Sequence, residues 1–286
     1  MDNILVNYDR SQSAIFEMYG IHVTRAVKKA DLNLHTHDFD ETFIIVAGSA
    51  RHVIGNYSYQ INRGDVYVIK KGVAHGFFEV DNLEIVDLMY YPDLFSVIDM
   101  QLYSLLLPLF IVEPDIRTYN YYPYVLSLTE SEVDYVATSA AFIVQELLKR
   151  TPDNNNVAIR YCLLSLFAYL SVKYAANDNE PQVTQILSKA IQYIHENMAK
   201  RIKISDISSH LFISTRHLNR LFRKYYGCTP GDYLHDIRFK HAITLLSKNH
   251  MKVQEVSALC GFSDPSYFSR SFKETYGITP NKVAKK

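Results

Sequence analysis

The chain has 286 residues, of which 48% are apolar and 21% charged, and its formal net charge at pH 7 is zero. This length is enough for two domains that each bury a core, and the apolar content excludes a chain that is disordered throughout. No basic and apolar leader opens the sequence, and the longest apolar run, residues 105–112, is too short to cross a bilayer. We therefore expect a cytoplasmic protein, with three reduced cysteines in its cores because their spacing fits neither a metal nor a redox motif.

The zero net charge conceals two halves of opposite sign. Residues 183–286 carry 17 Lys and Arg against 7 Asp and Glu, whereas residues 1–182 carry 13 against 23. A basic domain favours a polyanion such as DNA as its partner, although a solvated basic surface is the alternative.

Residues 1 to about 90 have the pattern of many short strands. Runs rich in Val, Ile, Tyr and Phe are separated by Gly, Asn and Asp, which is typical of a small barrel or jelly roll. The predicted strands are residues 41–46, 51–54, 57–61, 66–69 and 83–89, with turns at 47–49, 55–56 and 62–65.

Three histidines and one glutamate stand out in this region. His35 and His37 point to the same side of a strand, because side chains alternate with a period of two. Glu41 follows closely, and His75 on a distant strand can complete a site of nitrogen and oxygen ligands inside a barrel. The alternative is that these histidines form hydrogen bonds in the barrel or line a sugar pocket.

The stretches 35–48 and 64–75 resemble the two motifs of the cupin family, with Lys29, Lys70 and Glu79 in place of the usual Gly, Pro and Asn. The resemblance implies a divalent metal held by four residues, His35, His37, Glu41 and His75. An effector pocket is the other implied use, since a ligand pocket combines an apolar wall with a few polar groups. Its predicted residues are His35, His37, Glu41, Arg51, Tyr67 and His75, and His52 and Tyr57 are further candidates. The pattern requires no cofactor, and both uses stay open.

Helical patterns follow the strands. Residues 92–107 predict a helix, and an irregular Tyr-rich connection through residues 119–123 comes next. Thr129 and Glu132 have the spacing of a capping box, which starts a helix with a broad apolar face. Residues 157–174 predict a second such helix, so the two form a pair that covers the barrel or joins two copies of the chain.

The same unit occurs twice between Ile204 and Pro280, with Phe, Tyr, Gly, Thr and Pro recurring at an offset of 50 residues. In each copy a short helix is followed by a turn and a second helix, which is the pattern of a helix-turn-helix. The second helices begin at a capping residue, Ser214 or Asp264, and end at Gly227 or Gly277. The predicted first helices are residues 205–211 and 253–259, and a helix over 233–247 joins the copies.

The run from Cys260 to Lys273 and the Gly-x-Thr-Pro that closes each copy resemble the DNA-binding domain of AraC/XylS-type transcription regulators. The resemblance implies that two recognition helices enter successive segments of the major groove. Base contacts then fall to Arg216, Asn219, Arg220, Ser266, Ser269 and Arg270, and phosphate contacts to Ser214, Arg223, Lys224, Lys240 and Lys273. Because arginine and asparagine can each form two hydrogen bonds with a base, the first copy is expected to carry more of the specificity.

The fold class that follows is a multidomain α+β protein, with an N-terminal β-barrel of the cupin or jelly-roll kind, a helical pair, and an all-α domain with two helix-turn-helix units. The predicted domains are residues 1–91, a cupin that senses an effector; 92–175, a helical dimerisation region; 176–182, a linker; and 183–286, the DNA-binding domain.

The His-x-His-Asp-Phe stretch at residues 35–39 most resembles the rhamnose-type regulators of the family. The resemblance implies a ligand-responsive DNA-binding regulator, an activator of a sugar-utilisation operon that is not itself an enzyme. Its implied partners are double-stranded DNA, a sugar effector, a second copy of the chain and RNA polymerase, with no membrane. Two alternatives are a metal-dependent cupin enzyme, an isomerase or dioxygenase, fused to a DNA-binding domain, and a regulator controlled by a protein partner without a small ligand.

Overall fold

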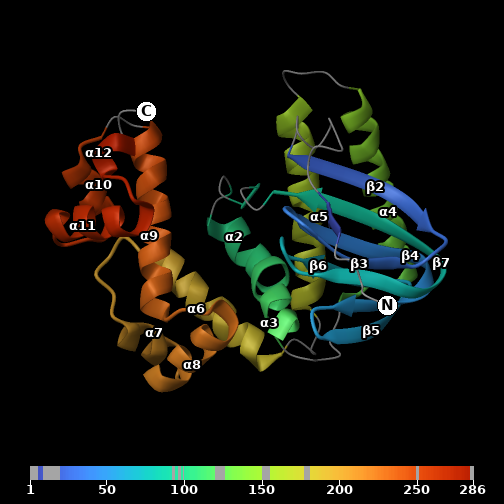
Figure 1. Ribbon diagram of the computed structural model, residues 1–286, viewed down its shortest axis with the longest axis horizontal. Coiled ribbons are helices and arrows are strands. Elements are labelled where there is room, and N and C mark those ends of the chain that lie inside the picture. The colour runs from blue at the N-terminus through green and yellow to red at the C-terminus, as the bar shows by residue number, and fades with distance from the viewer. Residues whose placement is uncertain are drawn as a thin grey trace. The chain divides into compact units, whose positions relative to one another are not determined.

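The computed structural model describes residues 6–8, 20–91, 94–95, 98, 100–119, 126–149, 155–176, 181–248 and 251–283 (Figure 1). The chain divides into two compact units, an N-terminal unit, Met1–Thr184, and a C-terminal unit, Gln185–Lys286. Each unit has its own hydrophobic core. The division falls near the start of a helix, and residues 177–180 of the predicted linker lie outside the described residues.

The strands that the structure describes form one eight-stranded sheet in the N-terminal unit, in the order β1-β3-β7-β4-β6-β8, with β2 paired to β7 and β5 to β4. All pairings except that of β1 with β3 are antiparallel. This strand-rich fold confirms the predicted fold class of the N-terminal region. The strands are β1 Val6–Tyr8, β2 Ile21–Lys28, β3 Leu32–His37, β4 Asp40–Ile54, β5 Tyr57–Asn62, β6 Asp65–Ile69, β7 His75–Tyr90 and β8 Leu126–Ser127.

Strand β4 runs without interruption through residues 47–49, where the sequence predicted a turn. Gly48 has a φ of +73°, and a Cβ atom there would lie 2.3 Å from the carbonyl oxygen of Asn82. The pairing of β4 with β7 shifts register on both sides of Ala47. The predicted turn is therefore wrong: these residues form an irregularity inside one long strand, as β-bulges do where a sheet bends.

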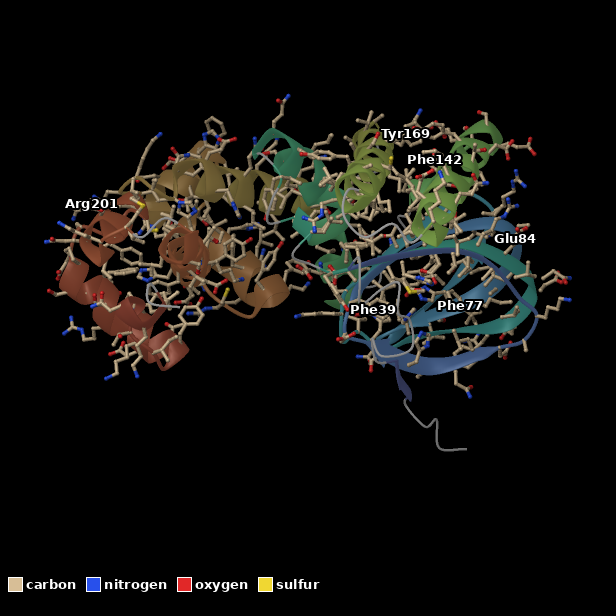
Figure 2. The ribbon with its side chains drawn as sticks, turned by 90° about the horizontal axis from the view of Figure 1, so that it is seen from above. Phe39, Phe77, Glu84, Phe142, Tyr169 and Arg201 are labelled. Carbon is tan, nitrogen blue, oxygen red and sulfur yellow. The ribbon has the colours of Figure 1, made fainter. Side chains whose placement is uncertain are left out.

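The helices of the N-terminal unit lie to one side of the sheet, as Figure 2 shows for Phe142 and Tyr169, whereas Phe77 lies among the strands. Apolar residues of the sheet and of these helices share one core. The backbone N–H of Thr129 donates to Glu132 Oε2 at 2.8 Å, which confirms the predicted capping box. The helices are α2 Met100–Leu107, the π-helix η3 Pro108–Val112, α3 Glu113–Tyr119, α4 Glu130–Leu148 and α5 Asn155–Ala175.

Residues 108–119 are helical, although the sequence predicted an irregular connection after residue 107. Pro108 directly follows α2 and begins the π-helix, and Leu109, Phe110 and Val112 are buried. Within the described residues, α5 is long and apolar enough between Val157 and Ala175 to cross a membrane. That helix nevertheless contributes Leu163, Leu164, Leu166, Phe167 and Leu170 to the core of the unit.

The C-terminal unit is helical and contains the two predicted helix-turn-helix units. Ser214 Oγ accepts a hydrogen bond from the N–H of His217 at 3.1 Å, and Asp264 Oδ1 accepts one from Ser266 at 2.8 Å. Gly227 and Gly277 end the second helices in the left-handed conformation, so the predicted caps are confirmed. The helices are α6 Gln182–Asn197, α7 Ile204–His210, α8 Thr215–Tyr226, α9 Pro230–Lys248, α10 Val253–Leu259, α11 Pro265–Tyr276 and α12 Pro280–Val283.

Candidate functional site

Three side chains from three strands converge inside the N-terminal unit. His37 ends β3, Glu41 lies near the start of β4 and His75 begins β7, and all three are buried. Glu41 Oε2 lies 3.2 Å from His37 Nε2 and 3.2 Å from His75 Nε2. All three atoms lie within 4.8 Å of one another, which is close enough for them to bind one metal ion.

The tautomer of His37 turns a lone pair toward this cluster. Its Nδ1 lies 2.7 Å from the carbonyl oxygen of Phe39, and because a carbonyl only accepts, Nδ1 carries the proton and Nε2 does not. Metal-bound histidines are oriented by a hydrogen bond of this kind. Among the described residues, His37 Nε2, Glu41 Oε2 and His75 Nε2 have no hydrogen-bond partner. Three converging buried atoms of nitrogen and oxygen without hydrogen bonds therefore fit a divalent cation.

Burial gives these groups unusual proton affinities. It raises the pKa of Glu41 to about 7 and lowers the pKa of both His37 and His75. Asp87, on β7, has a pKa raised well above its usual value, first by burial and then by the charge of Glu41. The interior thus disfavours charged groups, and a bound cation would reverse that preference for the carboxylate.

The other predicted ligand and pocket residues differ in their placement. His35 is buried with its ring centroid 4.3 Å from that of His75, yet its nitrogens do not belong to the three-atom cluster. Tyr67 is buried in the interior, where burial raises its pKa. Arg51 does not face the interior: it forms an ion pair with Glu79 at 2.8 Å, and its side chain is 37% exposed.

The structure therefore corrects the prediction that Arg51 lines an interior pocket, and the alternation of side chains along a strand explains why. Its neighbour His52 is fully buried, with Nε2 3.4 Å from His75 Nδ1 and its ring centroid 5.2 Å from that of Tyr67. Since successive side chains of a strand point to opposite faces, an interior His52 places Arg51 outside.

Sequence reasoning missed a buried ion pair on α3. Arg117 is 1% exposed, its Nε donates to Glu113 Oε1 at 2.7 Å, and its guanidinium lies 5.0 Å from the ring of Tyr59 and 5.1 Å from that of Tyr67. Burial, followed by the charge of Arg117, lowers the pKa of His52 to about 3. The spacing of Glu113 and Arg117, four residues apart, is the signal for such a pair, but it applies only in a helix.

The predicted base-contacting residues lie on exposed sides of α8 and α11. Arg216 and Arg220 are exposed and Asn219 is half-buried between them, with its Nδ2 donating to the carbonyl oxygen of Thr215 at 2.8 Å. Arg220 Nη2 lies 3.3 Å from His217 Nδ1. The positions three and four residues apart share one face of α8, opposite its buried apolar residues. On α11, Ser266 and Arg270 are exposed and Ser269 is half-buried.

The predicted phosphate-contacting residues are exposed too. Lys240 differs from the others because it lies on α9, where it forms an ion pair with Asp236 at 2.7 Å. The remaining four belong to α8 or α11 or cap α8: Ser214, Arg223, Lys224 and Lys273.

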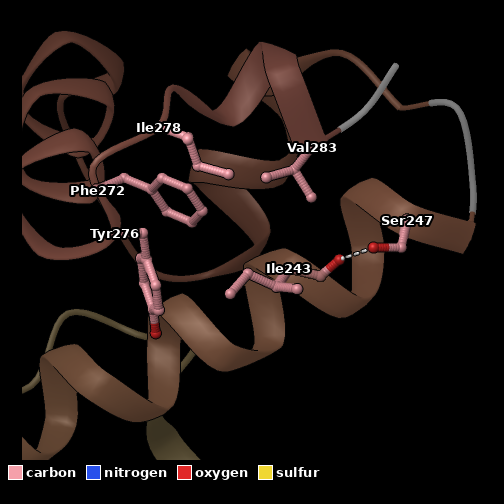
Figure 3. Close-up of a pocket in the computed structure, with 6 residues that line it drawn as sticks. All are labelled: Ile243, Ser247, Phe272, Tyr276, Ile278 and Val283. Atoms are coloured by element: carbon pink, nitrogen blue, oxygen red, sulfur yellow. Dashed lines mark hydrogen bonds between the residues drawn. The ribbon is translucent and has the colours of Figure 1, made fainter. Parts of the chain in front are cut away.

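A hollow in the C-terminal unit lies between α9, α11 and α12 (Figure 3). The hydroxyl of Ser247 donates to the carbonyl oxygen of Ile243 at 2.8 Å, and the rest of the lining is mostly apolar. Because a binding site for a polar ligand needs several convergent polar groups, this hollow is a weaker candidate than the interior cluster of the N-terminal unit.

Comparison with known proteins gives one family match in each compact unit. Residues 207–286 match the family model described as a helix-turn-helix domain, and residues 22–89 match that of a cupin domain. The HTH-type transcriptional activator RhaR of Pectobacterium atrosepticum is 26% identical over 87% of this chain and 84% of its own length. RhaR of Enterobacter sp. is 28% identical over 86% and 84%. The crystal structure of a Chromobacterium violaceum regulator with an AraC-type DNA-binding domain is 28% identical, covering 35% of this chain and 90% of that one, at a TM-score of 0.34.

Proposed function

We propose that this chain is an AraC-type regulator with a cupin domain, a ligand-responsive DNA-binding protein that activates a sugar-utilisation operon. The observation that carries the proposal is the combination in one chain of a cupin with a buried polar cluster and two helix-turn-helix units with exposed basic second helices. The likeness to RhaR activators over most of the chain supports activation as the sign of regulation. The resemblance of residues 35–39 to rhamnose-type regulators supports a sugar as the effector. The C-terminal unit reads DNA, and the N-terminal unit binds the effector.

The interior cluster suits a polyol ligand. His37, Glu41 and His75 are the residues that would hold a divalent cation, which when bound would supply a Lewis-acidic anchor for hydroxyl oxygens. The rings of Phe43 and Tyr67 are buried beside His52, and that of Phe77 beside His75, so these three rings would form the apolar wall of the proposed sugar site. His52, which takes the interior position, belongs to the pocket in place of Arg51.

The proposed partners are a second copy of the chain, which pairs through α4 and α5, and RNA polymerase, and the proposed location is the cytoplasm. The likeness to transcription regulators favours this role over that of a metal-dependent enzyme. An enzyme would lose turnover of a substrate in His37→Ala while DNA binding persisted, whereas a regulator would lose its response to the effector.

Sugar-dependent DNA binding tests the effector proposal directly. Duplexes are first selected from a random-sequence library by the full-length protein, and binding is then titrated in the presence of individual sugars and organic acids. We expect one sugar to change the affinity for the selected duplex and to raise the melting temperature of the N-terminal unit. If DNA is bound but no small molecule alters binding or melting, control by a protein partner becomes the better explanation.

The two recognition helices are compared with matched alanine variants. Arg220→Ala on α8 and Arg270→Ala on α11 each remove an exposed arginine. We expect the α8 variant to lose more discrimination, on the order of 1–3 kcal/mol at one base pair, because α8 presents two arginines and an asparagine where α11 presents one arginine and two serines. Equal or larger loss from Arg270→Ala would contradict the greater role of the first unit.

A further inference from the structure

Arg238, in the middle of α9, is a buried arginine. It contacts both the segment that follows α6 and the turn of the second helix-turn-helix. We propose that it is a positioning residue, which fixes the separation of the two helix-turn-helix units so that the protein accepts only one spacing between the two DNA segments they read. The inference rests on the proposed DNA-binding function and adds to it the feature that sets the spacing.

The guanidinium of Arg238 forms three contacts. Its Nε donates to the carbonyl oxygen of Met198 at 2.8 Å, and its Nη2 donates to that of Lys200 at 2.7 Å. Both carbonyls lie in the short segment that follows α6, which ends at Asn197. The guanidinium also lies 5.5 Å from the ring centroid of Phe262, in the turn of the second helix-turn-helix. One side chain therefore joins the end of α6 to that turn.

Helix α6 lies against the first helix-turn-helix, because the ring of Tyr193 is 4.8 Å from that of His210 on α7. Helix α9 also contacts the first unit, through Tyr233 and Phe222 with centroids 5.5 Å apart. The second half of α9 packs into the core of the second helix-turn-helix, around Phe239. Without Arg238, the second helix-turn-helix would be joined to the first mainly along α9. The second helix-turn-helix could then rotate more easily about the axis of α9.

The backbone of the second turn confirms that it lies directly against the end of α6. A Cβ atom on Gly261 would lie 2.4 Å from the carbonyl oxygen of Met198 and 2.8 Å from Arg238 Nη2. Such distances leave no room for a side chain without displacing backbone.

The turn of the first helix-turn-helix shows why position 261 requires glycine. The reason is the close contact with the end of α6 and not the conformation of the turn. Phe212 occupies the position equivalent to Gly261, has a φ of +55° and is 95% exposed. The backbone hydrogen bonds around the two residues match: Ile213 donates to Ser208 as Phe262 donates to Ser257. The left-handed turn therefore tolerates a side chain, and glycine at 261 serves the close approach to α6.

An arginine suits this position because its planar fork directs separate donors at two acceptors, whereas a lysine ammonium is a single point charge. Two substitutions weaken the connection from opposite sides. Arg238→Met removes both hydrogen bonds while retaining an unbranched apolar stem, and Gly261→Ala pushes the turn away from Met198. Phe212→Ala is the matched control, since it changes the equivalent turn at a side chain that is 95% exposed.

The test selects duplexes from a random-sequence library with each full-length protein and compares the spacing of the enriched motifs. We expect the wild type and Phe212→Ala to enrich two motifs at one separation, and Arg238→Met and Gly261→Ala to enrich the same motifs at several neighbouring separations. Affinity for a duplex that holds only the motif read by the first helix-turn-helix should be the same in all four proteins. Affinity for the two-motif duplex should fall about tenfold in the two variants, because a looser connection lowers the effective concentration of the second unit.

The spacing is a readout that a loss of stability alone would not move. If Arg238→Met and Gly261→Ala both keep the single separation, the inference is wrong, and if Arg238→Met does not fold, Gly261→Ala decides alone. A wild type that enriches one motif, or two motifs at variable separation, overturns the inference while the DNA-binding function stands. A wild type that enriches no motif overturns that function as well.

Discussion

The convergence of His37, Glu41 and His75 has an energetic cost that helps to identify its use. A buried polar atom without a hydrogen bond costs about 1–3 kcal/mol, and the cluster holds three such atoms. Packing alone gives no reason to keep them, since apolar residues of similar size would fill the same space more favourably. A ligand that all three atoms bind would offset that cost, and this is why the cluster is the centre of the proposed effector site.

Glu41→Gln tests whether that ligand includes a cation. We expect a divalent ion such as Zn²⁺ or Mn²⁺ to raise the melting temperature of the wild type, with about 2.7 kcal/mol of stabilisation at a concentration 100 times the Kd. The variant should lose most of this stabilisation, because the amide carries no charge. Asp81→Asn, which removes an exposed carboxylate, should respond like the wild type. An equal rise in Glu41→Gln would show that the ion binds elsewhere.

His195, on α6, gives the C-terminal unit a pH-dependent stability. Burial, followed by the charge of Lys240, lowers its pKa to about 4, below the value of 6.5 expected in the unfolded chain. The unfolded state therefore binds the proton first, so stability is complete above pH 6.5 and falls as the pH decreases toward 4, by at most about 3 kcal/mol. His235 and His241 also have lowered pKa values and add to the slope.

Thermal unfolding of the full chain between pH 7.5 and 4.5 measures this effect. His195→Gln should flatten the pH dependence of the C-terminal transition without removing it, because the two other histidines remain. The same slope in the variant and the wild type would show that His195 does not contribute.

Among the elements, α4 and α5 carry an apolar surface that the N-terminal unit does not use itself. Phe142 on α4 is 52% exposed and Tyr161 on α5 is 66% exposed, although the opposite faces of both helices are buried. We expect Phe142→Glu with Tyr161→Glu to convert a dimer into a monomer, because charges at the centre of an apolar interface are desolvated without partners. Light scattering during size-exclusion chromatography gives the mass directly.

Val27→Glu is the control for that experiment, since Val27 is 54% exposed but belongs to β2 and not to the helical pair. It should leave the mass unchanged. A wild type that is monomeric at micromolar concentration would show that the pair only covers the sheet, and a dimer that survives both charges would place the interface on another surface.

Elements with local signals could be predicted from the sequence, whereas those that depend on distant contacts could not. Helix α10 was predicted at residues 253–259 and begins and ends there, because its spacing of apolar residues and its following turn are local. The irregularity at Gly48 depends on the backbone of Asn82, which is 34 residues away in the chain. The outward direction of Arg51 likewise depends on which face of β4 closes the interior.

The candidate site shows the same limit. His37, Glu41 and His75 could be named because strand periodicity and a motif place them, but Arg117 and Glu113 could not, since their segment lacked a clear helical pattern after Pro108. Their importance comes from contact with Tyr59 and Tyr67, which only the folded chain brings near them.

At the scale of the whole molecule, charge and packing divide the chain at nearly the same place. The acidic residues 1–182 and the basic residues 183–286 correspond closely to the two compact units, each with its own core. Because each core is complete in itself, we expect the full chain to unfold in two calorimetric transitions. Ligands should then act selectively: the effector should raise one melting temperature and the selected duplex the other.

Two marker substitutions assign the transitions. Phe167→Ala removes a fully buried ring from the core of the N-terminal unit, and Phe268→Ala does the same in the C-terminal unit, so each should lower one melting temperature, at a cost of about 3–5 kcal/mol. A single transition lowered by both would mean that the units fold cooperatively. If the units are separate but the effector also shifts the transition marked by Phe268→Ala, the two binding sites are coupled in the absence of DNA, and the size of that shift measures the coupling free energy that regulation requires.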